Sequence, residues 1–282
     1  MTITEAFTRF DNELYATGKK LKTRKNYKSA YVSLIAAIGD IPIELLTFDH
    51  IATWQMLMRR NGKQPSTIKG ELCRLRQVLC FFRERGVPVI DYRDIKLPSV
   101  PKKEPVWLEA NEVRQFLQVI TSPRDKAIFA SLFGTGARIS ELLQLDRDSI
   151  VNGEAHIIGK GSKPGILYFD DYSLSLIEHY LDGRHDSLRP LFISGQYRRI
   201  TVSRVEQLAH IYEDMSGISK NMTPHILRHS FASDLIYNGA DLYTVKEQLR
   251  HSSIATTQIY THVKQDQIKR NYQMYHTKIH ET

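Results

Sequence analysis

The sequence predicts a mainly α-helical protein that carries one small antiparallel β-sheet, and three observations support this fold class. Apolar residues recur at spacings of three and four along most of the 282 residues, as in helices with one buried face. Two short apolar runs flank a Gly, Lys and Pro turn in EAHIIGKGSKPGILYFDD (residues 154–171), which predicts a β-hairpin. IKLPSVPKKEPVW (residues 95–107) holds three prolines and cannot continue a helix.

The proline-rich stretch divides the chain. We predict a helical domain over residues 1–96, an extended linker over 97–106 and a second domain over 107–282. Within the first domain, STIKGELCRLRQVLCFFRERG (residues 66–86) predicts a long helix that Ser66 caps and Gly86 ends. Its buried face consists of Ile68, Leu72, Leu75, Leu79 and Phe82.

Basic residues are concentrated in the first domain. Residues 1–100 hold 17 Lys and Arg against 10 Asp and Glu, a net charge of +7, whereas residues 101–282 hold 22 against 21. We interpret this excess as a surface that grips a DNA phosphate backbone, with a merely solvated basic surface as the alternative. The candidate DNA contacts there are Lys19, Lys20, Lys22, Arg24, Lys25, Lys69, Arg76 and Arg83.

The second domain is expected to alternate helices with the hairpin. LEANEVRQFLQVI (residues 108–120) predicts a helix with Glu109 and Glu112 near its start, where acids are favourable. RDKAIFASLFGTGARISELLQL (residues 124–145) predicts an apolar helix, a glycine turn and a second helix that opens near Arg138. After the hairpin, the chain is predicted to be mostly helical from Ser173 onward.

The composition excludes several classes of protein. No apolar run approaches the roughly 20 residues that a membrane helix needs. MTITEAFTRFDNELY has acids and no apolar core, so we do not expect a secretory signal. Cys73 and Cys80 lie seven residues apart in a helical pattern, too far to bridge, and we expect reduced thiols in a cytoplasmic protein. We expect no cofactor.

TPHILRHSFAS (residues 223–233) can be interpreted in two ways. His225 and His229 have the spacing of two zinc ligands on one helical face. His225 and Arg228 also share a face, where together they suit a phosphate. A metalloprotease motif needs a glutamate directly after the first histidine, but Ile226 stands there, and the cationic Arg228 favours an anion. We therefore predict an anion site without a metal, with His229 as a structural neighbour.

Other motifs carry groups of the same kind. Arg138 in GTGARISEL follows a glycine turn near a helix start, a position that suits a phosphate, and Glu141 could hold its guanidinium. Lys160 lies between glycines in GKGSKPG, which let the backbone approach a ligand closely, and Lys163 is the alternative candidate for a functional lysine in this segment. Each motif alone is weak.

Together these motifs resemble the tyrosine recombinase (phage integrase) family. The chain is most similar to its small two-domain members, the Xer chromosome-dimer resolvases and the recombinases of transposons. The resemblance covers nearly the whole chain, with the motifs spread over residues 134–263. It rests on six residues in the family's order and spacing: Arg138, Lys160, His225, Arg228, His251 in LRHSSIATTQ and Tyr260 in IYTHV.

The resemblance implies a site-specific recombinase with a SAM-like, core-binding helical clamp in its first domain. Tyr260 would attack DNA to form a 3′-phosphotyrosyl intermediate, and exchange would pass through a Holliday junction. Arg138, Arg228 and His251 would stabilise the phosphate, His225 would assist loss of the Tyr260 proton, and Lys160 would protonate the 5′ oxygen. Neither a metal nor ATP is required.

The resemblance also implies partners. They are double-stranded DNA with a partly palindromic core site, a tetramer of this chain on two such sites, and accessory proteins or a second recombinase; no membrane is involved. The tail after Tyr260 is a candidate helix that either docks on a neighbouring protomer or packs on its own domain.

One position departs from the family pattern. The family usually has glycine before the second histidine, whereas this chain has Arg250. We expect Arg250 either to add a phosphate or DNA contact or to be solvated and inert. Two other functions stay open, a type IB topoisomerase that relaxes DNA of any sequence and a catalytically silent DNA-binding protein of the same fold.

Overall fold

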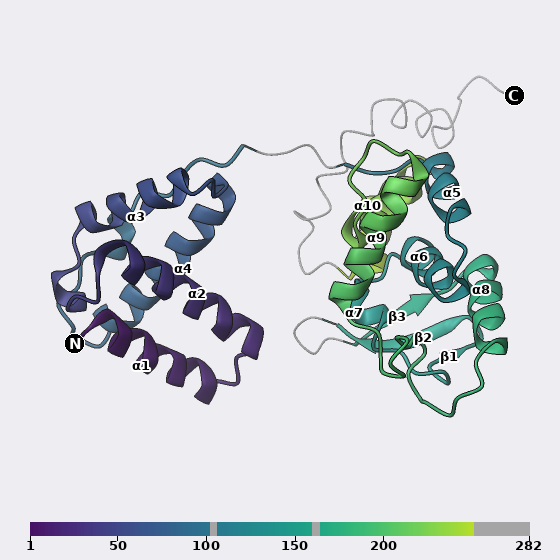
Figure 1. Cartoon of the computed structure of the whole chain (residues 1–282), viewed down its shortest axis with the longest axis horizontal. Helices are drawn as coiled ribbons and strands as arrows, with labels where there is room; N and C mark the ends of the chain where they lie inside the picture. The colour runs from purple at the N-terminus through teal and green to yellow at the C-terminus, as the bar shows by residue number, and fades with distance from the viewer. Residues whose placement is uncertain (102–105, 160–163, 251–282) are drawn as a thin grey trace, which may run out of the picture. The chain divides into compact units, whose positions relative to one another are not determined.

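The computed structural model describes residues 1–101, 106–159 and 164–250. The chain divides into two compact units, residues 1–103 and 104–282, each with its own hydrophobic core (Figure 1). The described residues between the cores, 97–101, include Pro98 and Pro101 and contribute no fully buried apolar side chain to either core. The units are called unit 1 and unit 2 below.

Unit 1 is built from helices. Its elements are α1 (Ile3–Ala16), α2 (Leu21–Ile38), η1 (Ile43–Leu45), α3 (Phe48–Arg60), α4 (Pro65–Arg83) and η2 (Tyr92–Asp94). Thr2 and Glu5 form a capping box that starts α1. Trp54 of α3 is 1% exposed, and its indole N–H donates to the Ser33 hydroxyl of α2 at 3.0 Å. A buried indole therefore joins two helices without leaving a polar group unpaired.

The helix predicted over residues 66–86 is α4, and its expected buried face is confirmed. Its expected start is wrong. Gln64 is the N-cap residue, without a side-chain cap bond, and Pro65 occupies the first helical position. Proline is favoured there because its missing N–H would have no helical acceptor, so the helix needs no cap from Ser66. The helix ends at Arg83, three residues before Gly86.

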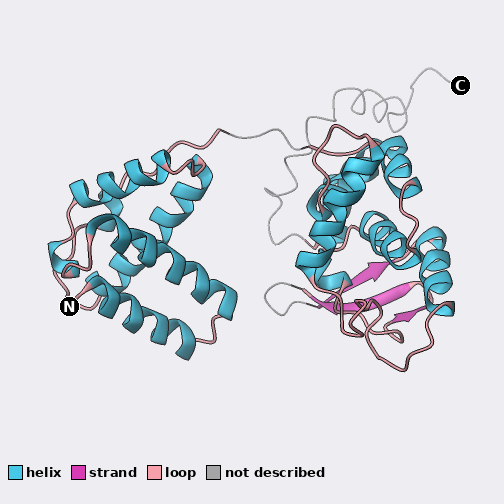
Figure 2. Cartoon of the chain, in the orientation of Figure 1, coloured by secondary structure: helices cyan, strands magenta, loops and turns pink. Residues whose placement is uncertain are grey.

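Unit 2 combines helices with a three-stranded antiparallel sheet, and the alternating burial along β2 shows that one face of the sheet packs against the core (Figure 2). Its elements are α5 (Ala110–Gln118), α6 (Pro123–Thr135), α7 (Ile139–Leu142), β1 (Ile150–Val151), β2 (Glu154–Ile158), β3 (Pro164–Tyr168), α8 (Asp171–Asp182), α9 (Val202–Ser216), α10 (Pro224–Tyr237) and α11 (Leu242–Leu249). The predicted hairpin is confirmed as β2 and β3, in a register that pairs His156 with Ile166 and Ile158 with Pro164.

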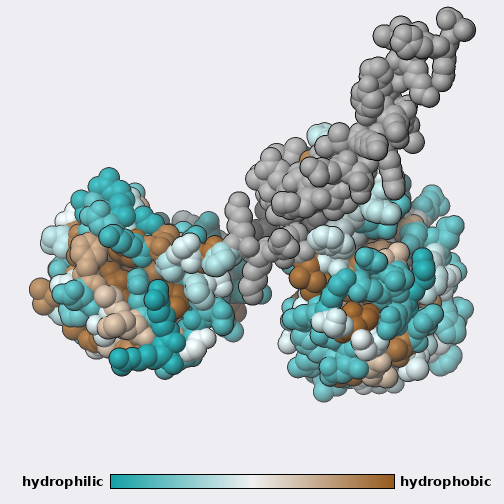
Figure 3. Space-filling view, turned by 90° about the horizontal axis from the view of Figure 1, so that it is seen from above, coloured by the Kyte–Doolittle hydropathy of each residue, from teal (hydrophilic) through white to brown (hydrophobic). Residues whose placement is uncertain are grey.

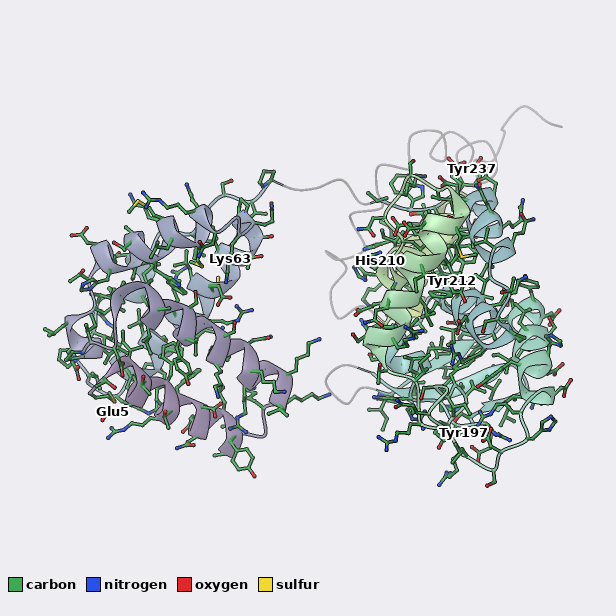
Figure 4. The ribbon with its side chains drawn as sticks, in the orientation of Figure 1. Glu5, Lys63, Tyr197, His210, Tyr212 and Tyr237 are labelled. Atoms are coloured by element: carbon green, nitrogen blue, oxygen red, sulfur yellow. The ribbon has the colours of Figure 1, made fainter. Side chains whose placement is uncertain are left out.

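Helix α6 is the centre of unit 2, packed against α8 and α10. Most of its side chains are buried, which explains why its sequence is apolar on every face. Its one buried acid, Asp125, accepts a hydrogen bond from the Tyr212 hydroxyl of α9 at 2.8 Å (Tyr212 is labelled in Figure 4). Burial and this carboxylate raise the pKa of Tyr212 to about 12. Both polar groups are therefore satisfied inside the core.

Among the described residues, the prediction of a mostly helical chain after Ser173 is confirmed by α8, α9, α10 and α11. The segment between α8 and α9 is not helical. Arg184 organises it by donating to the Pro190 and Leu191 carbonyls and to the Asp186 carboxylate.

Among the described residues, no helix is long and apolar enough to cross a membrane. Figure 3 shows hydrophilic residues over most of the visible described surface of unit 2.

Candidate active site

The turn between α6 and α7 presents Arg138. Gly136 ends α6 in the left-handed region, with φ at 58°, and the ring of Phe231 from α10 lies against it. A Cβ on Gly136 would fall 2.2 Å from a ring carbon of Phe231, so both the backbone angle and the space require glycine. Two residues later, Arg138 is the N-cap residue of α7.

Glu141 fixes the orientation of Arg138. One carboxylate oxygen accepts from the Arg138 main-chain N–H at 3.0 Å, and the other accepts from Arg138 Nη1 at 2.7 Å. Glu141 is 4% exposed. Burial acts to raise the pKa of its carboxyl, but the hydrogen bonds from Arg138 and the charges of Arg250 and Arg138 outweigh burial, and the pKa lies below its ordinary value. Glu141 is therefore an ionised, buried partner.

Arg250 also binds Glu141. It follows the last residue of α11 in the left-handed region, with φ at 52°, a conformation that costs a non-glycine residue about 1–2 kcal/mol. Its Nη2 lies 3.0 Å from Glu141 Oε2, and its Nη1 donates to the Gln248 carbonyl at 2.7 Å and the Ile166 carbonyl at 3.3 Å. Its side chain is 13% exposed. The alternative of a solvated Arg250 is wrong, because the guanidinium is enclosed by a carboxylate and carbonyls.

Arg228 brings α10 into the same site. It is 4% exposed and donates from Nη1 to the Gly136 carbonyl at 2.6 Å and from Nη2 to the Leu249 carbonyl. Arg138 Nη2 donates to the next carbonyl, that of Arg250, at 3.3 Å. Because Arg138 and Arg228 bond to carbonyls of consecutive residues, their guanidinium groups lie together at the end of α11.

His225, at the start of α10, lies beside this pair. Partial burial of its ring, followed by the charges of Arg228 and Arg138, lowers its pKa, although one side of the residue is exposed to solvent. The His225 and His229 Nε2 atoms are 2.9 Å apart, so one donates to the other. Burial and the neighbouring His225 and Arg228 lower the pKa of His229 to about 4. Both rings are neutral near pH 7, a state that suits proton acceptance.

His229, which the sequence predicts as a structural neighbour of the anion site, is a direct partner of His225. The spacing of four residues on one helix was the available signal. Lys160, its rival Lys163, His251, Tyr260 and the tail lie outside the described residues. The nearest described positions to Lys160 and His251 are the ends of β2 and α11. Within the described ranges, no three His, Cys, Asp or Glu side chains gather so that they could hold a metal ion.

The candidate DNA contacts of unit 1 fall into two sets. The first set is exposed and consists of Lys19, Lys20, Lys22, Lys25 and Lys69. The second set is bonded within the unit. Arg24 forms a bidentate pair with Asp11 at 2.8 and 2.5 Å, and Arg76 donates to the Tyr92 carbonyl at 2.7 Å. Arg83 lies 3.3 Å from the carboxylate of Asp91. DNA contacts by either set stay a prediction.

Comparisons with known proteins show the family and the fold of this chain. The model of the phage integrase family matches residues 106–267. Tyrosine recombinase XerD of Oceanobacillus iheyensis is 34% identical over 255 residues, which cover 82% of this chain and 86% of that protein. The Tn1549 transposon integrase in complex with circular intermediate DNA superposes with a TM-score of 0.79 at 18% identity, over 96% of this chain and 99% of that chain. A lambda integrase tetramer bound to a Holliday junction superposes with a TM-score of 0.74 at 19% identity, over 90% and 78% respectively.

The buried Glu141 carboxylate predicts a stability effect. Glu141→Ala should lower the free energy of unfolding by about 3 kcal/mol, because it leaves two arginines without their shared anion. The measurement is denaturant unfolding monitored by circular dichroism. The control is Glu178→Ala on α8, an exposed acid that we expect to change stability by less than about 0.5 kcal/mol. Equal losses in the two variants would contradict the role given to Glu141.

The histidine pair predicts a pH effect. The folded state holds the pKa of His229 at about 4, below the ordinary 6.5, so the unfolded chain binds a proton that the folded chain does not. His229 therefore makes its full contribution to the free energy of unfolding above pH 6.5, and this contribution is lost as the pH falls toward 4. Between about pH 7 and about pH 5, wild type should lose about 2 kcal/mol more than His229→Gln. Parallel pH profiles of the two proteins in denaturant unfolding would count against a neutral, paired His229.

Proposed function

This chain belongs to the phage integrase family and is a site-specific tyrosine recombinase, and we propose that Tyr260 is its nucleophile. We assign the phosphate site to Arg138, His225 and Arg228, with His251 and Lys160 completing it. The observation that carries this assignment is the meeting of Arg138 and Arg228 at the end of α11, directly before His251. Two guanidinium groups from different helices on consecutive carbonyls form an anion site that no single motif could make.

The arginines supply the electrostatic part of the reaction. When the Tyr260 oxygen attacks phosphorus and the 5′ oxygen leaves, the non-bridging oxygens carry additional negative charge in the transition state. Arg138 and Arg228 stabilise that charge from fixed positions, because Glu141 and the carbonyls of Gly136 and Leu249 already orient them. Little reorganisation is then needed as the charge develops.

Proton transfer falls to the remaining groups. Tyrosine has an ordinary pKa near 10, so its hydroxyl must lose a proton as it attacks. A neutral His225, with its pKa lowered by burial and by the two arginines, accepts that proton directly or through water. Lys160 protonates the leaving 5′ oxygen, and His251 donates a hydrogen bond to the phosphate. A 5′-hydroxyl of a second duplex then attacks the phosphotyrosine, which restores Tyr260 and joins the strands without ATP.

We assign residues 1–96 to a DNA clamp and residues 107–282 to catalysis, with a linker between them. The start of α2 supports the clamp, since it has no side-chain cap and no acid in its first turn, and Lys22 and Lys25 lie exposed there. Cations are unfavourable at a helix N-terminus, and a DNA phosphate would offset both the charges and the uncapped N–H groups.

We further propose that four copies act on two partly palindromic sites and exchange strands through a Holliday junction. The lambda integrase tetramer on such a junction supports this assembly. Accessory proteins or a second recombinase would give direction to the exchange. We place the protein on DNA in the cytoplasm, where the thiols of Cys73 and Cys80, which are free in this structure, would stay reduced.

Covalent capture tests the nucleophile and the site specificity together. Wild type and Tyr260→Phe are each mixed with fragmented genomic DNA in EDTA, stopped with detergent, and the protein-linked DNA is sequenced. We expect wild type alone to enrich one short, partly palindromic site. Adducts scattered over all sequences would indicate a topoisomerase. DNA binding without any adduct would indicate a silent binding protein and would contradict the proposal.

The clamp predicts a salt effect. Replacing Lys19, Lys20, Lys22 and Lys25 by Gln should reduce the slope of log K against log salt by about 0.9 for every DNA phosphate that these lysines neutralise. Arg at the same four positions should restore the slope, because it keeps the charge. The measurement is a titration of labelled duplex by fluorescence anisotropy at several salt concentrations. An unchanged slope in the Gln variant would remove these lysines from the interface.

A further inference from the structure

We propose that Arg250 is a positioning residue, which acts through Glu141 to hold the guanidinium of Arg138 in register with strand β3. The inference rests on the proposed function, since its effect is on cleavage of DNA. It assigns to Arg250 neither a phosphate contact nor an inert place on the surface. The role follows from two contacts that Arg250 makes with different parts of unit 2 and from its backbone conformation.

The first contact closes a ring of three residues. Arg138 Nη1 binds Glu141 Oε1 at 2.7 Å, Arg250 Nη2 binds Glu141 Oε2 at 3.0 Å, and Arg138 Nη2 donates to the Arg250 carbonyl at 3.3 Å. Each carboxylate oxygen therefore receives a different arginine side chain. If Arg250 were absent, Glu141 Oε2 would keep only the N–H of Arg138, and the carboxylate could rotate together with the guanidinium it holds.

The second contact joins the ring to the hairpin. Arg250 Nη1 donates to the Ile166 carbonyl at 3.3 Å, and its Cδ lies over Gly165, where an added Cβ would come within 2.6 Å. Both residues belong to β3, which begins at Pro164, four residues after Lys160 in the sequence. Arg250 therefore fixes the start of β3 relative to Arg138. One buried side chain thus contacts both the strand that follows Lys160, the proposed general acid, and the arginine that we assign to the phosphate site.

The third feature is the backbone of Arg250 itself. Its φ of 52° is one that glycine adopts freely and arginine does not. The contacts of the side chain must offset that strain, and with 13% exposure they hold the guanidinium within the protein. Both terminal nitrogens of its guanidinium are directed toward Glu141 and main-chain carbonyls of unit 2.

Single-turnover cleavage of the captured site, at saturating protein, tests the inference. Arg250→Ala should cleave about 10–100-fold more slowly than wild type, because a small displacement of a catalytic group has effects of that size. Its Kd for DNA should stay within about threefold. Arg250→Lys, which keeps the charge but not the fork, should recover part of the rate.

A double-mutant cycle separates positioning from general damage. If Arg250 acts through Arg138, then Arg138→Ala and Arg138→Ala/Arg250→Ala should cleave within about twofold of each other. The matched control is Arg184→Ala, which removes a buried arginine with the same kind of partners, main-chain carbonyls and a carboxylate, away from the site. It should lower Tm as Arg250→Ala does, but it should leave the cleavage rate of the folded protein unchanged.

Three results would overturn the inference. They are an Arg250→Ala rate within about twofold of wild type, rate reductions from Arg138→Ala and Arg250→Ala that multiply, or an effect confined to Kd. If Arg250→Ala does not fold, Arg250→Lys takes its place in the cycle. The Tm values of Glu141→Gln, Arg250→Lys and the double variant test the contact between Glu141 and Arg250 without a measurement of cleavage. Additive Tm shifts would also overturn the inference. Failure of the proposed function is distinct, because wild type would then form no Tyr260 adduct.

Discussion

The site depends on one buried carboxylate. Glu141 is 4% exposed, and its two oxygens receive the main chain and side chain of Arg138 and the side chain of Arg250. Removing a carboxylate from water is costly unless it is paired and hydrogen-bonded, so Glu141 is tolerated only where both arginines are in place. The same requirement sets the start of α7, the end of α11 and the position of β3 around one point.

Arg228 makes a second connection between elements of unit 2, beside the one that Glu141 makes. Its guanidinium ties the α6–α7 turn, through the Gly136 carbonyl, to the end of α11, through the Leu249 carbonyl. Phe231, one turn farther along α10, closes over Gly136. The cationic groups that would bind a phosphate thus also hold the helices together. Their positions are set by folding, before any DNA is bound, which is the condition for electrostatic catalysis without large reorganisation.

Local sequence patterns were enough to predict many elements of this fold. The two short apolar runs around GKGSKPG predicted the hairpin, and the glycine turn of GTGARISEL predicted a helix that opens near Arg138. Contacts across long separations could not be predicted. Glu141 and Arg250 are 109 residues apart, and their spacing carries no periodicity that reveals a pair. The bond from Arg76 to the Tyr92 carbonyl and the Arg184 network after α8 were hidden for the same reason. The roles of Lys160, His251 and Tyr260 came from family resemblance, and these residues lie outside the described ranges.

The most direct test of the account is a structure of the protein trapped covalently on its own site, using a nicked duplex that prevents religation. We predict a bond from Tyr260 Oη to the 3′ phosphorus, with nitrogens of Arg138 and Arg228 within hydrogen-bond distance of the non-bridging oxygens. Glu141 should still bind Arg138 and Arg250 in that complex. A phosphate held by other side chains, or an Arg138 released from Glu141 to reach it, would contradict the claim that folding alone sets the anion site.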